Sequence, residues 1–236
     1  QPQPPTPTPP PPPPPPPPRP PPPPPPLFPP PPPPHPKKKY TNKPTNQALP
    51  VSIIICAHNE SENLKKNLPH ILNQSYRSLE IIVVNDNSTD KTWDILVEFQ
   101  KKVPTLRIIN LSHNKKIGKK HALSEGIKAA KHKILLLTDA DCAPHNEHWV
   151  QEMQEAIRGD IQIGLGYGPY TTYPGFLNKF IRFETVYTAI QYLSFALIGQ
   201  TYMGVGRNLI YRKELFYQAN GFHEHEHIAS GDDDLF

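Results

Sequence analysis

Three short polar segments of this chain carry carboxylates, and each directly follows a run of β-branched and aliphatic residues. They are His58-Asn59-Glu60, Asn85-Asp86-Asn87-Ser88 and Thr138-Asp139-Ala140-Asp141. Taken alone, each segment is more typical of a turn or a helix cap. If the runs are parallel strands, their carboxyl ends meet at one edge of a sheet, where ligands bind. We therefore expect the three segments to form one site.

Asp139 and Asp141 are the candidate metal ligands. In an extended segment, residues two apart point to the same side, so both carboxylates would face one way and Ala140 the other. Such a pair offers hard oxygen ligands to Mg2+ or Mn2+ and leaves coordination positions open for the oxygens of a diphosphate. A solvated loop is the alternative interpretation.

Further along the chain, three more polar groups are candidates for chemistry. Lys119 and Lys120 open an expected helix, where backbone amides and ammonium groups could face phosphate, although a solvated basic turn is the simpler interpretation. The crowded carboxylates of Asp232, Asp233 and Asp234 could supply a general base or form an acidic turn. His223, His225 and His227 could share one face of a strand and bind zinc, but the sequence favours a polar loop.

Competing motifs fail on spacing. An EF-hand loop that starts at Asp86 would need Gly and Glu where the chain has Lys91 and Val97. A P-loop that ends at Lys119 would need a glycine where His113 stands, and no Ser or Thr follows the lysine. The glycines at 164, 166 and 168 do not follow the first strand, which argues against a dinucleotide fingerprint. A nucleotidyltransferase would likewise need a glycine-rich phosphate loop near that strand.

Hydrophobic periodicity predicts the elements that position these groups. Strands are expected over residues 51–57, 80–84, 106–109 and 134–137, with helices over 64–72, 93–97 and 122–130 between them. This alternation predicts an α/β fold with a mainly parallel sheet, right-handed crossovers and helices on both faces. The pattern then predicts a helix over 149–157, a strand over 161–170, a helix over 176–198, a strand over 209–211 and a helix over 213–219. Residues 186–199 are too polar to span a bilayer and are typical of a buried or interfacial helix.

Composition divides the chain into three parts. Of its 35 prolines, 30 fall within residues 1–50, which carry five basic residues and no acidic one. We expect residues 1–36 to be a disordered polyproline II tail, 37–50 a basic linker and 51–236 one domain. The domain has a net charge of −1, which gives no reason to expect nucleic-acid binding. Two cysteines cannot form a disulfide framework and favour a reduced, intracellular setting. The chain lacks an initial Met and stops within an acidic cluster, so we expect a fragment.

In this order, the motifs of residues 50–236 resemble family 2 glycosyltransferases of the GT-A fold, most closely their membrane-associated bacterial branch. Six segments carry the resemblance: VSIIICAHNE from Val51, VVNDNSTD from Val83, GKKHALSEG from Gly118, LLTDADC from Leu136, GVGRNL from Gly204 and SGDDDL from Ser230. The resemblance implies an inverting transfer of a sugar from a nucleotide-sugar, with UDP expected, to a hydroxyl acceptor. That acceptor would belong to glycan, lipid or cell-envelope synthesis.

The resemblance also assigns roles to single residues. It places Cys56, His58 and Glu60 in the nucleotide pocket and has Asp86 accept a hydrogen bond from the base. Lys119 would approach the diphosphate, and Asn208 would contact the nucleotide-sugar. Asp139 and Asp141 match the family's DxD element, with Asp141 the stronger candidate for Mg2+ or Mn2+. The later acidic element makes Asp232 the catalytic base; Gly231 stands where the family has Glu, so Asp233 remains an alternative.

The resemblance further implies a cytoplasmic-facing, membrane-associated protein whose membrane segments lie outside this chain. The alternative function is a proline-rich interaction protein that presents Pro-x-x-Pro sites to SH3 or WW domains and carries a non-catalytic nucleotide-sugar-binding module.

Overall fold

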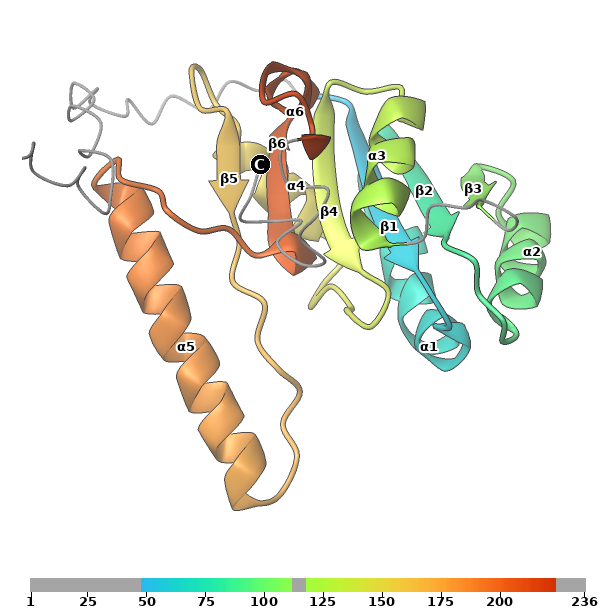
Figure 1. Cartoon of the computed structure of the whole chain (residues 1–236), viewed down its shortest axis with the longest axis horizontal. Coiled ribbons are helices and arrows are strands. Elements are labelled where there is room, and N and C mark those ends of the chain that lie inside the picture. Colours follow the sequence, from blue (N-terminus) through green and yellow to red (C-terminus); the bar gives the residue numbers. More distant parts are fainter. Residues whose placement is uncertain (1–47, 112–117, 224–236) are drawn as a thin grey trace, which may run out of the picture. The chain divides into compact units, whose positions relative to one another are not determined.

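The computed structural model describes residues 48–111 and 118–223. In this part of the chain, strands and helices alternate around one sheet (Figure 1). The strands are β1 (Val51–Ala57), β2 (Leu79–Asn85), β3 (Leu106–Asn110), β4 (Ile134–Asp139), β5 (Ile163–Leu165) and β6 (Leu209–Arg212). The helices are α1 (Ser61–Leu72), α2 (Thr92–Lys102), α3 (Lys119–Ala129), α4 (Trp149–Ala156), α5 (Phe176–Leu197) and α6 (Lys213–Gln218), with a 3-10 turn, η1 (Gly206–Asn208).

The sheet has the strand order β3-β2-β1-β4-β6-β5. The first four strands along this order are mutually parallel, with β1 paired to both β2 and β4. Of the strands in the described part of the chain, only β6 runs in the opposite direction, and it pairs antiparallel with β4 and β5. The prediction of a mainly parallel α/β sheet is therefore confirmed.

Both faces of the sheet carry a hydrophobic core. In β1, Ile53 and Ile55 pack with buried residues of α1, α2 and α4, whereas Ile54 packs with buried residues of α3 and α6. Successive side chains of a strand point to opposite faces, so a continuous apolar run such as residues 53–57 requires cover on both sides. The expected two-sided arrangement of helices is confirmed.

The predicted strand over 161–170 is wrong beyond a short core, because only Ile163–Leu165 form β5. The glycines that follow are needed for close packing against η1. A Cβ atom at Gly166 would lie 2.2 Å from Nδ2 of Asn208, and one at Gly168 would lie 2.8 Å from Nε of Arg207. These glycines are explained by close packing rather than by strand alternation.

Helix α5 differs from the other helices in its surroundings. It is 22 residues long, and only Ala189 and Tyr192 among its residues are buried. In Figure 1 it extends well away from the sheet, beyond β5. Among the described residues, no helix is long and apolar enough to cross a membrane.

Several predictions fall on residues outside the described ranges. They concern the tail (1–36), all of the linker except residues 48–50, Asp232 and Asp233 as catalytic base, and His225 and His227 of the histidine cluster. These remain predictions.

Candidate functional site

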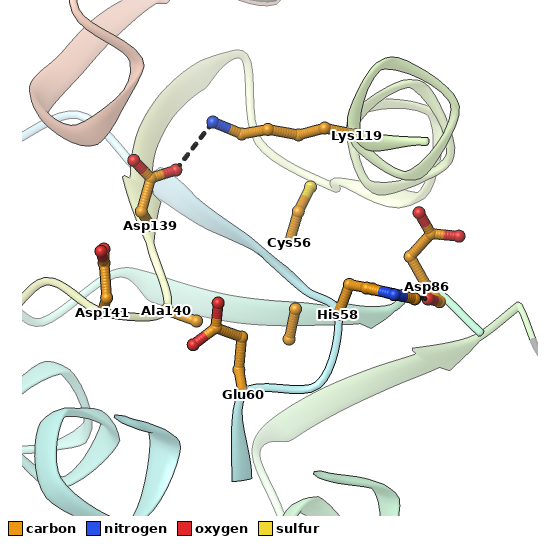
Figure 2. A pocket seen from close by; sticks show the side chains of 9 residues that line it. Cys56, His58, Glu60, Asp86, Lys119, Asp139, Ala140 and Asp141 are labelled. Atoms are coloured by element: carbon orange, nitrogen blue, oxygen red, sulfur yellow. Dashed lines mark hydrogen bonds and ion pairs between the residues drawn. The ribbon is translucent and has the colours of Figure 1, made fainter. Parts of the chain in front are cut away.

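The three polar segments singled out above line a single pocket at the carboxyl edge of the sheet (Figure 2). Its volume is about 260 Å³. The residues that line it are Cys56, Ala57, His58, Glu60, Asp86, Lys119, Asp139, Ala140 and Asp141. Ligands of open α/β sheets bind at this edge, and the expectation that the segments converge there is confirmed.

Asp139 and Asp141 lie next to each other on one side of the pocket (Figure 2). Asp139 ends β4, and the chain then turns, with the Cys142 amide donating to the Asp139 carbonyl at 3.1 Å. The segment is thus a turn and not extended as predicted. The carboxylates still converge, because one ligand atom from each of Asp139, Asp141 and Cys142 lies within 4.8 Å of the others. Ala140 is buried.

This donor set suits a hard divalent cation. Two carboxylates offer the oxygen ligands that Mg2+ and Mn2+ prefer. The third group, the Cys142 thiol, donates to Oδ1 of Asp141 at 3.3 Å. Burial, followed by the neighbouring Asp141 charge, raises the pKa of this thiol to about 12. Without a metal the thiol is therefore protonated at neutral pH, and the two carboxylates are the ligands that this site offers to a hard cation.

Lys119 brings a positive charge to the same cluster. It is the first residue of α3, and its Nζ lies 2.9 Å from Oδ1 of Asp139. Helix amino termini and lysines both favour anions. A phosphate between Lys119 and the two carboxylates would therefore meet a lysine, a helix amino terminus and any cation held by Asp141.

Asp86, on the opposite side of the pocket, holds the start of α3 in place. Its carboxylate is buried and accepts hydrogen bonds from the Gly118 amide at 2.9 Å and from the Asn87 side chain at 2.9 Å. Gly118 has a φ of 137°, a conformation that side-chain-bearing residues rarely adopt. Asp86 and Gly118 together therefore fix the position from which Lys119 extends.

His58 and Glu60 line the pocket from the loop after β1. Nδ1 of His58 lies 2.5 Å from the carbonyl oxygen of Asp86, and since a carbonyl only accepts, Nδ1 carries the hydrogen. The next residue, Asn59, has a φ of 58° and its side-chain oxygen accepts from the backbone amide of Thr89 at 2.8 Å. This bond ties the loop after β1 to the loop after β2.

One predicted binding residue lies elsewhere. Asn208 does not line the pocket; its side chain accepts from Nε1 of Trp149 at 3.0 Å and donates to the Tyr167 carbonyl at 3.1 Å. In the structure it connects η1, α4 and the segment after β5.

A residue outside the sequence motifs also positions the acidic turn between Asp139 and Asp141. Asn67 on α1 is buried, and its side chain donates to the Ala140 carbonyl at 3.1 Å. The sequence signal for this role is that Asn67 shares a helix face with the apolar Leu64, Leu68 and Ile71. A polar side chain on a buried face needs a hydrogen-bond partner.

Comparison with known proteins identifies the family. Residues 52–218 match Glycosyl transferase family 2, and the chain belongs to this family. Over 91 residues it is 38% identical to the poly-beta-1,6-N-acetyl-D-glucosamine synthase of Staphylococcus epidermidis, a match that covers 39% of this chain and 21% of that protein. Over 100 residues it is 35% identical to the UDP-Glc:alpha-D-GlcNAc-diphosphoundecaprenol beta-1,3-glucosyltransferase WfaP of Escherichia coli, covering 42% and 36% respectively. The matches thus span about a fifth to a third of these relatives.

A solved structure shares the fold. The mannosyltransferase PcManGT from Pyrobaculum calidifontis, in complex with GDP-Man and Mn2+, superposes with a TM-score of 0.59 over 82% of this chain and 54% of that chain. Sequence identity is 20%, so the likeness concerns the fold alone, which is GT-A.

Proposed function

We propose that this chain is the donor-binding and catalytic part of an inverting glycosyltransferase that moves a sugar from a nucleotide-sugar, with UDP as the nucleotide, to a hydroxyl acceptor. The observation that carries the proposal is the pocket in which Lys119 and the Asp139–Asp141 pair face Asp86 across the carboxyl edge of the sheet. A nucleotide-sugar has a base, a diphosphate and a sugar, and this pocket offers a distinct chemistry for at least the first two.

The nucleotide would lie across β1. Asp86 would accept a hydrogen bond from the base, and its carboxylate has lone pairs beyond those used by Gly118 and Asn87. Cys56, His58 and Glu60 would form the wall beside it. The names of the Escherichia coli relative and of the Pyrobaculum structure contain UDP-Glc and GDP-Man, which supports a nucleoside diphosphate donor.

Asp141 and Asp139 would hold Mg2+ or Mn2+, which supplies positive charge to a departing diphosphate when bound. Mn2+ in the Pyrobaculum complex supports this assignment. Lys119 adds a second charge, and its present ion pair with Asp139 leaves Asp141 as the main candidate ligand. Groups that stabilise charge on the leaving diphosphate lower the barrier because that charge develops in the transition state.

The acceptor hydroxyl would be activated by Asp232. In a single displacement the acceptor oxygen bonds to the anomeric carbon as the bond to the diphosphate oxygen breaks, and the hydroxyl proton passes to the Asp232 carboxylate. Attack from the face opposite the leaving group inverts the configuration. Asp232 lies outside the described residues, so its role rests on the SGDDDL motif alone, with Asp233 as the alternative.

The acceptor would be a glycan or lipid of cell-envelope synthesis, and the longer protein would be membrane-associated on its cytoplasmic side. The likeness of the motifs to the membrane-associated branch supports this location. The diphosphoundecaprenol acceptor in the name of the Escherichia coli relative supports a lipid-linked acceptor.

Release of UDP from a panel of UDP-sugars in the presence of Mn2+ tests the proposal, with Asp232→Asn and its neighbour Asp233→Asn compared with the wild type. We expect one of the two variants to lose at least about 100-fold in turnover, as removal of a general base does, while it still binds UDP. Turnover near that of the wild type in both variants would contradict the assignment of the base.

The alternative, a proline-rich interaction protein, rests on residues 1–36, which lie outside the described ranges. Binding of SH3 or WW domains to the tail, without any UDP binding by the folded domain, would favour it.

A further inference from the structure

We propose that α5 is an interfacial element that lies on the surface of an anionic lipid bilayer. The inference extends the proposed membrane association by assigning it to described residues. It stands independently of the sugar chemistry, because none of the residues involved lines the pocket.

Large apolar side chains of α5 are exposed to an unusual degree. Phe176 and Leu197, at its two ends, are 84% and 85% exposed, and Phe183 near its middle is 67% exposed. The other exposed members of this apolar face are Leu177, Phe180, Val186, Tyr187, Ile190, Phe195 and Ile198, the last just beyond the helix. Soluble surfaces rarely expose a contiguous apolar patch of this kind without a function.

The opposite side of α5 is held by its own chain. Tyr192 is buried and donates from its hydroxyl to the Gly166 carbonyl at 3.0 Å. Near the start of the helix, the Asn178 side chain accepts from the Tyr173 amide at 2.8 Å and donates to the Thr171 carbonyl at 3.1 Å. The helix is therefore fixed along its inner side and presents the apolar face outwards.

The width of the apolar face favours a bilayer over a second copy of the helix. At 3.6 residues per turn, the exposed positions from Phe176 to Ile198 cover about half of the helix circumference, with Leu177 and Val186 on opposite flanks. A two-helix seam uses a narrower stripe. A helix that lies in the headgroup region immerses about half of its circumference.

The charges and aromatic rings also fit a lipid surface. On the helix, Lys179 and Arg182 lie towards one margin of the apolar face and Glu184 towards the other, where long side chains can reach the headgroups. The apolar face itself includes Tyr187, which is 56% exposed, and tyrosine is enriched at membrane interfaces. Charged residues within α5 oppose a spanning orientation.

The test is co-flotation of the full chain with vesicles of phosphatidylcholine and phosphatidylglycerol. The variant Phe180→Ser/Phe183→Ser removes two exposed rings from α5, and Trp93→Ser removes an exposed ring from α2 as the matched control. All of these proteins keep the five cations of residues 1–50, so electrostatic binding by that segment is common to them.

We expect the double variant to bind these vesicles at least about tenfold more weakly than the wild type, because burial of aromatic surface drives insertion. Trp93→Ser should bind like the wild type. A Phe183→Trp protein should show stronger quenching by brominated lipids than the wild type. Binding of UDP and Mn2+, measured on the same preparations, should be unchanged, which separates this test from that of the proposed function.

Equal vesicle binding by the double variant and the wild type would overturn the inference. So would a wild type that binds no vesicles but forms a dimer that dissociates in the double variant, because the face would then be covered by a second copy.

Discussion

The position of Lys119 depends on the residue before it. Gly118 has a φ of 137°, and its backbone amide donates a hydrogen bond to the buried Asp86 carboxylate. The start of α3 is therefore fixed through the Gly118 backbone alone. Among the described residues, a Cβ atom there would meet no atom within 4 Å. Any effect of a substitution would therefore come from backbone strain rather than from a clash.

Gly118→Ala should cost about 1–3 kcal/mol of unfolding free energy, the usual penalty for a strained backbone. It should also weaken binding of UDP with Mn2+ about tenfold, as loss of a supporting contact does. Gly159→Ala is the matched control, because Gly159 also has a positive φ of 56° and open space around it. Urea unfolding and calorimetry would check both quantities. Unchanged UDP affinity in Gly118→Ala would contradict this role.

The Asp90 carboxylate should make the free energy of unfolding depend on pH. It accepts hydrogen bonds from Thr92 and Ser61 and so joins the loop after β2 to the start of α1. Burial would raise its pKa, but hydrogen bonds donated by Thr92 and Ser61 outweigh this and lower it from 3.8 to about 2. A carboxylate with a lowered pKa in the folded state stabilises the protein above its unfolded pKa, and this stabilisation is lost as the pH falls through the folded pKa.

Asp90→Asn should therefore be less stable than the wild type at pH 7, by up to about 1 kcal/mol, the range of charge interactions at exposed sites. The difference should shrink as the pH falls from 4 to 2. Urea unfolding at several pH values measures it, and Asp94→Asn, in the first turn of the following helix α2, serves as the control. A difference that stays constant down to pH 2 would refute the explanation.

At the scale of elements, helix α1 holds the acidic turn after β4 in place through a side-chain hydrogen bond. The Asn67 side chain reaches the Ala140 carbonyl, so a helix that contributes mainly core residues also fixes the turn between Asp139 and Asp141. Gln154 on α4 is a comparable buried polar residue, and it accepts a hydrogen bond from the Tyr76 hydroxyl away from the pocket.

Asn67→Leu should weaken Mn2+-dependent UDP binding about tenfold, because the turn loses a supporting contact. Gln154→Leu should leave that binding unchanged. Calorimetry with both variants measures the effect. Equal affinities in the two variants would show that the Asn67 bond only stabilises the fold.

The early elements could be predicted from sequence because their patterns are unambiguous. The run over 51–57 is apolar except for Ser52 and became β1 with the same bounds, since a strand covered on both faces needs no polar alternation. The segment after residue 161 could not be predicted in this way. Its glycines follow from contacts with Asn208 and Arg207, which come about 40 residues later in the chain.

At the scale of the whole molecule, the parts of the site that could be predicted are those that the strand order of the sheet brings together. Parallel strands bring their carboxyl ends together, so the convergence of His58, Asp86 and Asp139 could be predicted once the strands were identified, whereas only the family resemblance indicated Lys119. The bonds made by Asn67 and Asn59 could not be, because each depends on the exact placement of a loop against a distant element. The place of Asn208 between α4 and the segment after β5 is a contact of the same kind.

The central claim is that this pocket binds a nucleoside diphosphate through a divalent cation held by Asp141. Calorimetric titration of the wild type, Asp141→Asn and the exposed control Asp94→Asn with UDP, with and without Mn2+, tests it most directly. We predict that the wild type and Asp94→Asn bind UDP in a Mn2+-dependent manner and that Asp141→Asn binds at least about tenfold more weakly. A folded wild type that does not bind UDP with Mn2+, or an Asp141→Asn variant that binds it equally well, would contradict the claim.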